Sequence, residues 1–178
     1  MSVFPKSDTE KALHVLSDTW ASLKQDDLYV NWIGGEIAGL TLHSGIYNTA
    51  PLHKFATNFK KEHGGQIHRK VQVAAVDVNS GSYLLWDESA ADLEKGVVSS
   101  SSIPFIFPNQ NWGNGVVAMD GGTVWNTNLV SAVHRCREQA SDDSEITLDI
   151  VMADSKELEP WNEKTNSINN YLRYDSIK

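Results

Sequence analysis

The sequence has a single cysteine, no long hydrophobic run and few basic residues. With Cys136 as its single cysteine, this chain of 178 residues has no internal disulfide. No apolar stretch approaches the length of a membrane-spanning helix, and the first residues lack the pattern of a secretory signal, so neither secretion nor membrane insertion is predicted. Fifteen lysines and arginines stand against 23 aspartates and glutamates, a net charge of −8. That charge repels a phosphate backbone, so nucleic acid is not an expected partner.

Histidines and acidic residues are too scattered to predict a metal site. His63 and His68 lie five residues apart around Gly64-Gly65, whereas zinc ligands are usually spaced more tightly or in repeats. A histidine at the end of a helix, near its negative dipole terminus, explains His63 without a metal. The acidic residues at 142–145 lack the pattern of a calcium loop and are typical of a solvated loop. We therefore expect no metal and no cofactor.

Apolar periodicity divides the chain into alternating helices and strands, which is typical of an α/β fold. Hydrophobic residues make up 40% of the chain, enough for one domain with a core. Residues Ser7 to Glu10 have the form of a capping box before a helix of about four turns, and Pro51 and Gly64-Gly65 begin and end a second helix. The other predicted elements are helices at 89–98, capped by Asp87 or Ser89, at 126–136 and at 166–174, and strands at 71–78, 83–86, 115–119 and 146–152.

Two further segments have a less specific pattern. Residues 32–48 contain four glycines and no regular periodicity, so an irregular loop is predicted, with a lid or wall above a site as the alternative. Cys136 continues the apolar pattern of Leu129, Val130 and Val133, which predicts a core thiol rather than a nucleophile.

Asp120-Gly121-Gly122 is the strongest candidate for a catalytic motif. It directly follows the apolar run 115–119, which is predicted to be a short buried strand, and a predicted helix comes after it. Glycines permit a tight turn with positive φ that holds a carboxylate at the end of the strand. A strand, a turn with an acid and then a helix is how an α/β fold presents a general base. Asp before Gly is also a common pair in ordinary turns, so the tripeptide alone does not decide.

Three further segments, which follow a set order along the chain, make the motif more specific. Upstream, a predicted helix ending in the small residues Ser99 to Ser102 runs into Ile103-Pro104-Phe105-Ile106-Phe107-Pro108, and Asn126-Thr127-Asn128-Leu129 follows the Asp-Gly-Gly turn. The segment 71–81 reads as a central strand that ends in Asp77, a turn and a glycine. In this order the segments resemble the patatin-like phospholipase family, over roughly residues 30–155.

The resemblance implies a layered α/β sheet flanked by helices, with residues 1–178 forming part of a patatin-like domain. It implies a lipid or phospholipid ester as substrate, a Ser-Asp dyad, and a peripheral contact with a membrane as a further option. Asp120 is then the general base, with Gly121 and Gly122 shaping the motif, and Asp77 is a turn-forming carboxylate. A free aspartate has a pKa near 3.9 and is a weak base at neutral pH, so we expect partial burial to raise the pKa of Asp120.

The family's nucleophile and oxyanion motifs are absent from the sequence. No serine lies in a Gly-x-Ser-x-Gly nucleophile elbow, and no glycine-rich oxyanion loop is present. The nearest approach, Ser44-Gly45, lacks the glycine two residues before the serine and is predicted to be a turn. In the family the missing strand, oxyanion loop and elbow precede the matched segments, so the simplest interpretation is a chain truncated at its amino end. Such a piece would expose an apolar sheet edge and tend to associate.

Two functions follow from these observations. The first is a lipid acyl hydrolase of which this chain is a fragment carrying the base Asp120 but no nucleophile, and which is therefore inactive alone. The alternative is a catalytically dead, patatin-derived binding or interaction module. The sequence leaves the choice between them open.

Overall fold

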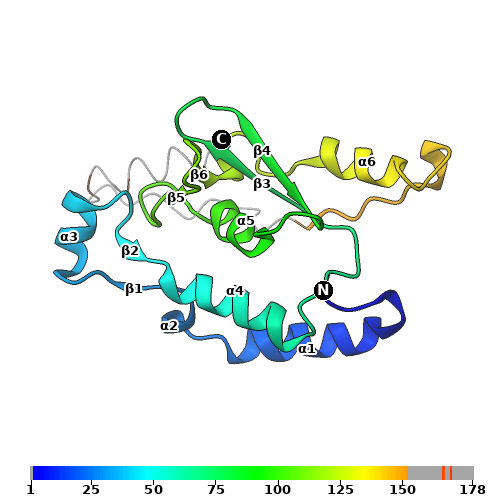
Figure 1. Cartoon of the computed structure of the whole chain (residues 1–178), viewed down its shortest axis with the longest axis horizontal. Helices are drawn as coiled ribbons and strands as arrows, with labels where there is room; N and C mark the ends of the chain where they lie inside the picture. The colour runs from blue at the N-terminus through cyan, green and yellow to red at the C-terminus, as the bar shows by residue number, and fades with distance from the viewer. Residues whose placement is uncertain (1, 152–165, 167–168, 170–178) are drawn as a thin grey trace. The chain divides into compact units, whose positions relative to one another are not determined.

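The computed structural model describes residues 2–151, 166 and 169 of the chain. Within these residues it is a mixed α/β structure with six α-helices and two antiparallel sheets (Figure 1). The chain divides into two compact units, Met1–Ile146 and Thr147–Lys178, and all the helices and strands named below belong to the first. The mixed α/β class expected from the sequence is therefore confirmed. None of the described helices is long and apolar enough to cross a membrane.

A four-stranded antiparallel sheet with the order β4-β3-β6-β5 forms the centre of the first unit. Its strands are β3 (Gln72–Asp77), β4 (Tyr83–Asp87), β5 (Gln110–Asn111) and β6 (Val117–Asp120). β3 and β4 form the hairpin predicted from the sequence, and β6 pairs with the other edge of β3. In that register Ala75 lies opposite Asp120, so the candidate base is joined to the middle of the central strand.

Helix α5 (Leu93–Ser100) covers one face of this sheet (Figure 1). Small side chains allow the close approach: a Cβ atom added to Gly96 would lie 3.1 Å from Cγ2 of Val73 on β3. The side chains at this contact are the most deeply buried in the unit, and they include Ala75, Val98, Ser99 and Ala118. The main core therefore lies between α5 and the strands β3 and β6.

The other helices surround this layer. They are α1 (Thr9–Ser22), α2 (Gln25–Leu28), α3 (Gly35–Leu42), α4 (Ala50–Glu62) and α6 (Leu129–Arg137). α4 contacts both α2 and α5, and a second small core formed by Val3, Phe4 and Ala12 packs against Val15, Phe59 and Ile67. The helices predicted around residues 9–23 and 51–63 are confirmed by α1 and α4.

The segment 32–48 is not the irregular loop that its glycines predicted. It contains α3, flanked by the short strands β1 (Val30–Asn31) and β2 (Tyr47–Asn48), which pair with each other (Figure 1). Gly34 and Gly35 have φ angles of 99° and 69° at the start of the helix. A Cβ atom on Gly39 would lie 2.2 Å from the carbonyl oxygen of Ile46, so this glycine lets the helix pack on β2.

The strand predicted at 146–152 is wrong for its described residues. Residues 146–151 have no strand structure, and Met152 lies outside the described residues. An extended segment becomes a strand only when a neighbouring strand completes its hydrogen bonds, and no described strand pairs with this one. Most of the helix predicted at 166–174 also lies outside the described residues.

Two predicted helix caps are also wrong. Before α1, the Ser7 hydroxyl donates to the Asp8 carboxylate, and the N-cap Asp8 makes no side-chain capping bond, so no capping box forms. α5 begins at Leu93 rather than at Ser89. Asp87 accepts hydrogen bonds from the backbone N–H and the hydroxyl of Ser89, which builds a local turn before the helix instead of a cap.

Candidate active site around Asp120

Asp120 is the last residue of β6, at the point where the strand turns into a short 3₁₀ segment, Gly121–Thr123. Its Oδ1 atom accepts a hydrogen bond from the backbone N–H of Gly122 at 2.7 Å. Its own backbone N–H donates to the carbonyl oxygen of Ser102 at 3.0 Å. Both the backbone and the carboxylate of Asp120 are therefore fixed in position.

The two glycines after Asp120 are needed for space rather than for positive φ. Neither Gly121 nor Gly122 has a positive φ, so that part of the sequence interpretation is wrong. A Cβ atom on Gly121 would lie 2.7 Å from the carbonyl oxygen of Ala74, which is closer than real Cβ contacts come. On Gly122 it would lie 3.1 Å from Oδ1 of Asp120. The glycine pair thus lets the turn pass close to β3 and leaves room beside the carboxylate.

Burial raises the pKa of Asp120 above that of a free aspartate, and the hydrogen bond from Gly122 opposes the rise. The direction is the one that a general base requires, because a higher pKa makes the carboxylate a better proton acceptor near neutral pH. Burial also raises the pKa of the nearby Tyr83 phenol, the Asn128 side chain acts in the opposite direction, and the charge of Asp120 raises it further. The Tyr83 ring packs against that of Trp125, with their centroids 4.9 Å apart.

No serine hydroxyl among the described residues bonds to the carboxylate of Asp120. The hydroxyl of Ser102 donates to the carbonyl oxygen of Val98 at 2.8 Å and accepts from the side chain of Gln110 at 3.1 Å. Ser99, which is equally buried, bonds to the carbonyl oxygen of Lys95. Both hydroxyls complete the hydrogen bonds of the core and are not free to attack a substrate.

Ser44, the nearest sequence approach to an elbow, lies in a bend, as predicted for a turn residue. Its hydroxyl oxygen accepts a hydrogen bond from the backbone N–H of Asn109 at 3.0 Å. This contact joins the residues just before β2 to the segment that follows Pro108.

The turn-forming role predicted for Asp77 is confirmed. Its carboxylate accepts hydrogen bonds from the hydroxyl of Ser80 at 2.6 Å and from the backbone N–H groups of Val117, Ser80 and Asn79. The Ser80 hydroxyl and the Val117 N–H hold the pKa of this carboxyl below its usual value. Asp77 therefore closes the β3–β4 turn and also fastens the start of β6, the strand that carries Asp120.

An asparagine does begin the helix after the motif. The side chain of Asn128 accepts from the backbone N–H of Ser131 at 3.1 Å and donates to its hydroxyl at 2.7 Å, so Asn128 is the N-cap of α6. The helix starts at Leu129, three residues later than predicted from Asn126. The expected order of strand, acidic turn and helix is therefore present.

His53, His63 and the acidic loop have protein partners. Nε2 of His53 lies 2.8 Å from the side-chain oxygen of Gln110, and the ring of His63 packs between those of Phe4 and Phe59. In the acidic loop, Asp143 forms an ion pair with Arg137. The described part of the chain holds no group of three or more His, Cys, Asp or Glu side chains suited to a metal ion.

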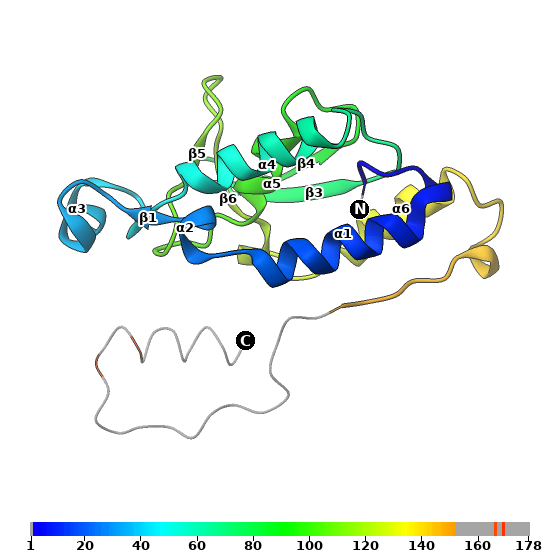
Figure 2. The ribbon, with the colours of Figure 1, turned by 90° about the horizontal axis from the view of Figure 1, so that it is seen from below.

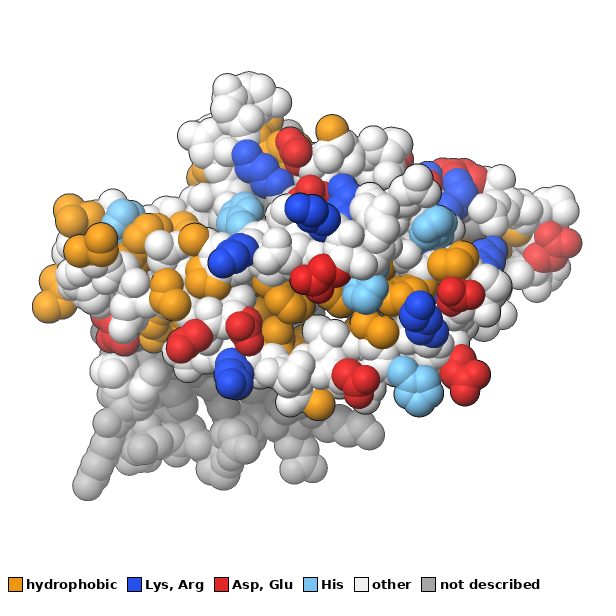
Figure 3. Space-filling model, turned by 60° about the horizontal axis from the view of Figure 1, so that its bottom comes forward, with side chains coloured by type: hydrophobic (Ala, Val, Ile, Leu, Met, Phe, Trp, Pro, Cys, Tyr) orange, Lys and Arg blue, Asp and Glu red, His pale blue; other side chains and the backbone are white. Residues whose placement is uncertain are grey.

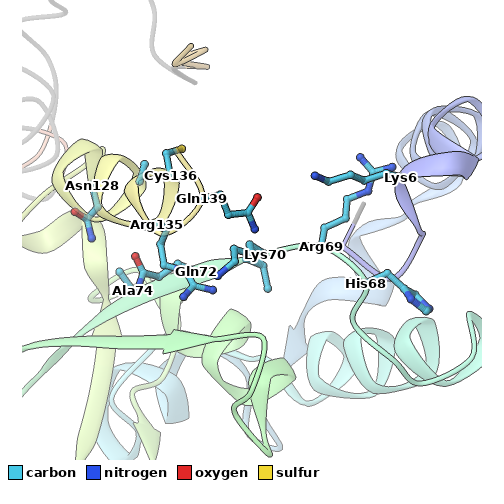
Figure 4. Close-up of a pocket in the computed structure, with 12 residues that line it drawn as sticks. Lys6, His68, Arg69, Lys70, Gln72, Ala74, Asn128, Arg135, Cys136 and Gln139 are labelled. Atoms are coloured by element: carbon cyan, nitrogen blue, oxygen red, sulfur yellow. The ribbon is translucent and has the colours of Figure 1, made fainter. Parts of the chain in front are cut away.

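A cavity of about 510 Å³ lies between α6 and the start of β3, and no sequence motif predicts it (Figure 4). Half-buried Cys136 lines this cavity, which corrects the expectation of a core thiol. Four basic residues line it as well: Lys6, Arg69, Lys70 and Arg135.

Most of these cations already have partners. The guanidinium of Arg69 donates to the backbone oxygens of Phe4 and Pro5, and that of Arg135 pairs with Glu88 and Glu138. Asp120 does not line the cavity. The cavity is therefore separate from the candidate base. Carboxylates offset the charge of Arg135 and that of Lys70, which pairs with Glu138, whereas Arg69 bonds to uncharged carbonyl oxygens.

Comparisons of the chain with models of known protein families, with curated proteins and with solved structures find no match. The geometry around Asp120 and the order of the motifs in the sequence are therefore the only guides to function.

Proposed function

We propose that this chain is the part of a patatin-like lipid acyl hydrolase that carries the general base, Asp120. The observation that carries the proposal is that this carboxylate, at the end of β6, is fixed in position and has a raised pKa. It is held by the N–H of Gly122, and burial raises its pKa. A fixed carboxylate with a raised pKa at the end of a strand is suited to accept a proton.

The arrangement of the motifs supports the same proposal. The small-residue end of α5, the segment 103–108, β6, the glycine turn and the asparagine-capped α6 follow one another in the order of the resemblance. The family's finer architecture, a layered sheet with helices on its faces, is part of this proposal.

In the proposed reaction, Asp120 accepts the proton of a serine hydroxyl as the serine oxygen attacks the ester carbonyl of a lipid. N–H donors stabilise the negative charge on the carbonyl oxygen, the alcohol leaves with a proton, and water then hydrolyses the acyl-serine. The sequence contains neither a Gly-x-Ser-x-Gly elbow nor a glycine-rich oxyanion loop. In this proposal the chain supplies the base and is inactive by itself.

The alternative is a catalytically inactive, patatin-derived binding module. The hydrogen bonds of the serines near the site favour it, because the hydroxyls of Ser99 and Ser102 are both engaged in the core. In such a module the Asp120 turn would remain as a structural feature.

Labelling with a serine-directed fluorophosphonate tests the absence of a nucleophile. We expect no adduct on the folded chain when its peptides are analysed by mass spectrometry. An adduct on one serine that disappears in Asp120→Asn would overturn this expectation and reveal a nucleophile that the sequence does not display.

The two functions differ in the protein encoded by the complete transcript. The hydrolase predicts an upstream coding segment with Gly-x-Ser-x-Gly, and a protein that cleaves phospholipid esters and loses this activity in Asp120→Asn. Asp92→Asn, at an exposed carboxylate without a side-chain capping bond, is the matched control and should retain activity. Activity that survives Asp120→Asn would exclude Asp120 as the base.

A further inference from the structure

The segment Ile33–Leu42, here named the α3 tip, carries an unusual number of exposed apolar side chains. Ile33 is fully exposed, Ile37 and Leu42 are each 77% exposed, and Leu40 is more than half exposed. α3 lies at one end of the first unit, beyond β1 and β2 (Figures 1 and 2). The space-filling view shows apolar side chains gathered at this end (Figure 3). Contiguous exposed apolar surface is typical of an interaction site.

The tip is held in place by a structured base. The indole N–H of Trp32 donates to the carbonyl oxygen of Gly45 at 3.1 Å, and its ring stacks on His43 with the centroids 3.7 Å apart. Ala38 is buried, and Gly39 packs on the backbone of Ile46. Because this side of α3 is packed so closely, Ile37 and Leu40 on its other side are held outward, and Leu42 is exposed as the last residue of the helix.

The tip has little charge and has aromatic side chains beside it, a composition suited to contact with a lipid surface. The tip has one charged side chain, Glu36, and its carboxylate lies 3.4 Å from the hydroxyl of Tyr47 at the base. It contains no lysine or arginine. Trp32 and the packed rings of Tyr29 and Tyr47 lie at the base. Tryptophan and tyrosine beside an apolar segment are the distribution found at the level of lipid headgroups.

We propose that the α3 tip inserts its apolar side chains into the surface of an uncharged, zwitterionic lipid layer. An anionic layer is not favoured, because the tip has no cation and the whole chain carries a net charge of −8. The attraction is then hydrophobic, and it does not depend on salt. This docking goes beyond the proposed hydrolysis and does not require Asp120.

One short segment connects the residues that support the tip to Asp120, the candidate general base. The backbone N–H of Ile46 donates to the carbonyl oxygen of Phe105 at 3.0 Å, and that of Tyr47 donates to Ile106 at 3.1 Å. At the start of the same segment, Ser102 accepts the backbone N–H of Asp120. Phe105 has a φ of 73°, which is rare for a residue other than glycine. Residues 102–106 are thus bonded at one end to Asp120 and at the other end to Ile46 and Tyr47, which lie next to the tip.

Flotation with phosphatidylcholine vesicles tests the proposal on the full chain. We expect the wild-type chain to float with the vesicles equally at low and high salt. The double variant Ile37→Gln, Leu42→Gln should partition at least about tenfold less, because it removes two apolar side chains from the lipid contact. Glutamine is a good helix former, so α3 should persist in far-ultraviolet circular dichroism.

The control variant is Leu13→Gln, Val130→Gln, which changes two side chains that are 53% and 61% exposed on α1 and α6. It should bind vesicles as the wild type does, and so should Asp120→Asn. Loss of lipid binding is therefore measured separately from loss of the base.

Three results would overturn the proposal. They are no flotation of the folded wild-type chain, an equal loss of binding in the control variant, and binding that needs anionic lipid and disappears at high salt. If the wild-type chain does not float, sedimentation without lipid shows whether the tip instead mediates self-association, since Ile37→Gln, Leu42→Gln would then be less associated than the wild type.

Discussion

The backbone N–H of Asp120 donates a hydrogen bond to the carbonyl oxygen of Ser102, 3.0 Å away. This bond joins the end of β6 to the residues that follow α5. Ser102 is itself buried, with its hydroxyl bonded to Val98 on the helix. The position of the candidate base therefore depends on how α5 packs on the sheet, and the small residues that end α5 are part of that packing.

The glycine directly after Asp120 offers a direct test of this packing. Gly121→Ala should lower the free energy of unfolding by about 1–3 kcal/mol, because its Cβ atom would lie 2.7 Å from a backbone oxygen of β3. Gly122→Ala is the matched control: its Cβ atom would approach side-chain oxygens, those of Asp120 at 3.1 Å and Asn126 at 3.5 Å, and no backbone atom of a neighbouring strand. We expect the control to change stability by less than about 1 kcal/mol in urea unfolding. Equal effects of the two variants would contradict the packing argument.

A pair of tryptophans should contribute strongly to stability. The rings of Trp86 and Trp112 are stacked with their centroids 4.6 Å apart, and the indole N–H of Trp112 donates to the hydroxyl of Ser99 at 3.2 Å. Trp112→Ala should cost about 2–4 kcal/mol of unfolding free energy. Trp20→Ala, at a side chain that is 70% exposed on α1, should change it by less than about 0.5 kcal/mol. A small effect at Trp112 would show that the stack contributes little.

Local signals in the sequence predicted the elements that local interactions determine. The β3–β4 hairpin follows from the Asn79-Ser80-Gly81 turn, and α4 from Pro51 at its start and Gly64-Gly65 after its end. α3 could not be predicted in this way, since the glycines at 34, 35 and 39 oppose a helix locally. The contact of Gly39 with Ile46 is tertiary, and no local pattern reveals it.

The candidate site was predicted only in part, because some of its features depend on local sequence and others on tertiary contacts. The position of Asp120 at the end of a strand follows from the apolar run before it, and the structure has it there. The reason for Gly121 does not follow, because the carbonyl of Ala74 reaches it from a strand more than forty residues earlier in the chain. The roles of the serines at 99 and 102 also depend on their burial and on the donors that reach their hydroxyls from later in the chain, Trp112 and Gln110.

The carboxylate of Asp77 should make the stability of the fold sensitive to acid. Its hydrogen bonds hold its pKa in the folded chain below the unfolded value of about 3.9. Its contribution is therefore present above that unfolded value and is lost as the pH falls through the folded pKa. Asp77→Ala should lower the urea midpoint of unfolding at neutral pH. The difference in midpoint between the variant and the wild type should become smaller in acid.

Asp18→Ala, at an exposed carboxylate on α1, is the control for Asp77. Alanine is the better helix former, so the midpoint should not fall, and its difference from the wild type should be the same at both pH values. Asp77→Asn keeps one oxygen acceptor and should fall between the wild type and Asp77→Ala. A gap that stays constant with pH would mean that Asp77 acts through its shape rather than its charge.

Asp120 should show the opposite dependence on pH. Burial raises its pKa in the folded chain, so this group favours folding most when it is protonated, and that advantage is lost as the pH rises through the folded pKa. Asp120→Asn removes the buried charge but retains an oxygen that can accept from the N–H of Gly122. We therefore expect the variant to be at least as stable as the wild type at neutral pH.

Urea unfolding at neutral pH and at about pH 3 checks this sign. The difference between Asp120→Asn and the wild type should be largest at neutral pH and should shrink in acid, where the aspartate is protonated in both states. Asp92→Asn should show no such change. A neutral-pH loss of stability in Asp120→Asn would mean that the ionised carboxylate stabilises the fold. Asp120 would then be a structural residue like Asp77, and the case for a general base would lose its main support.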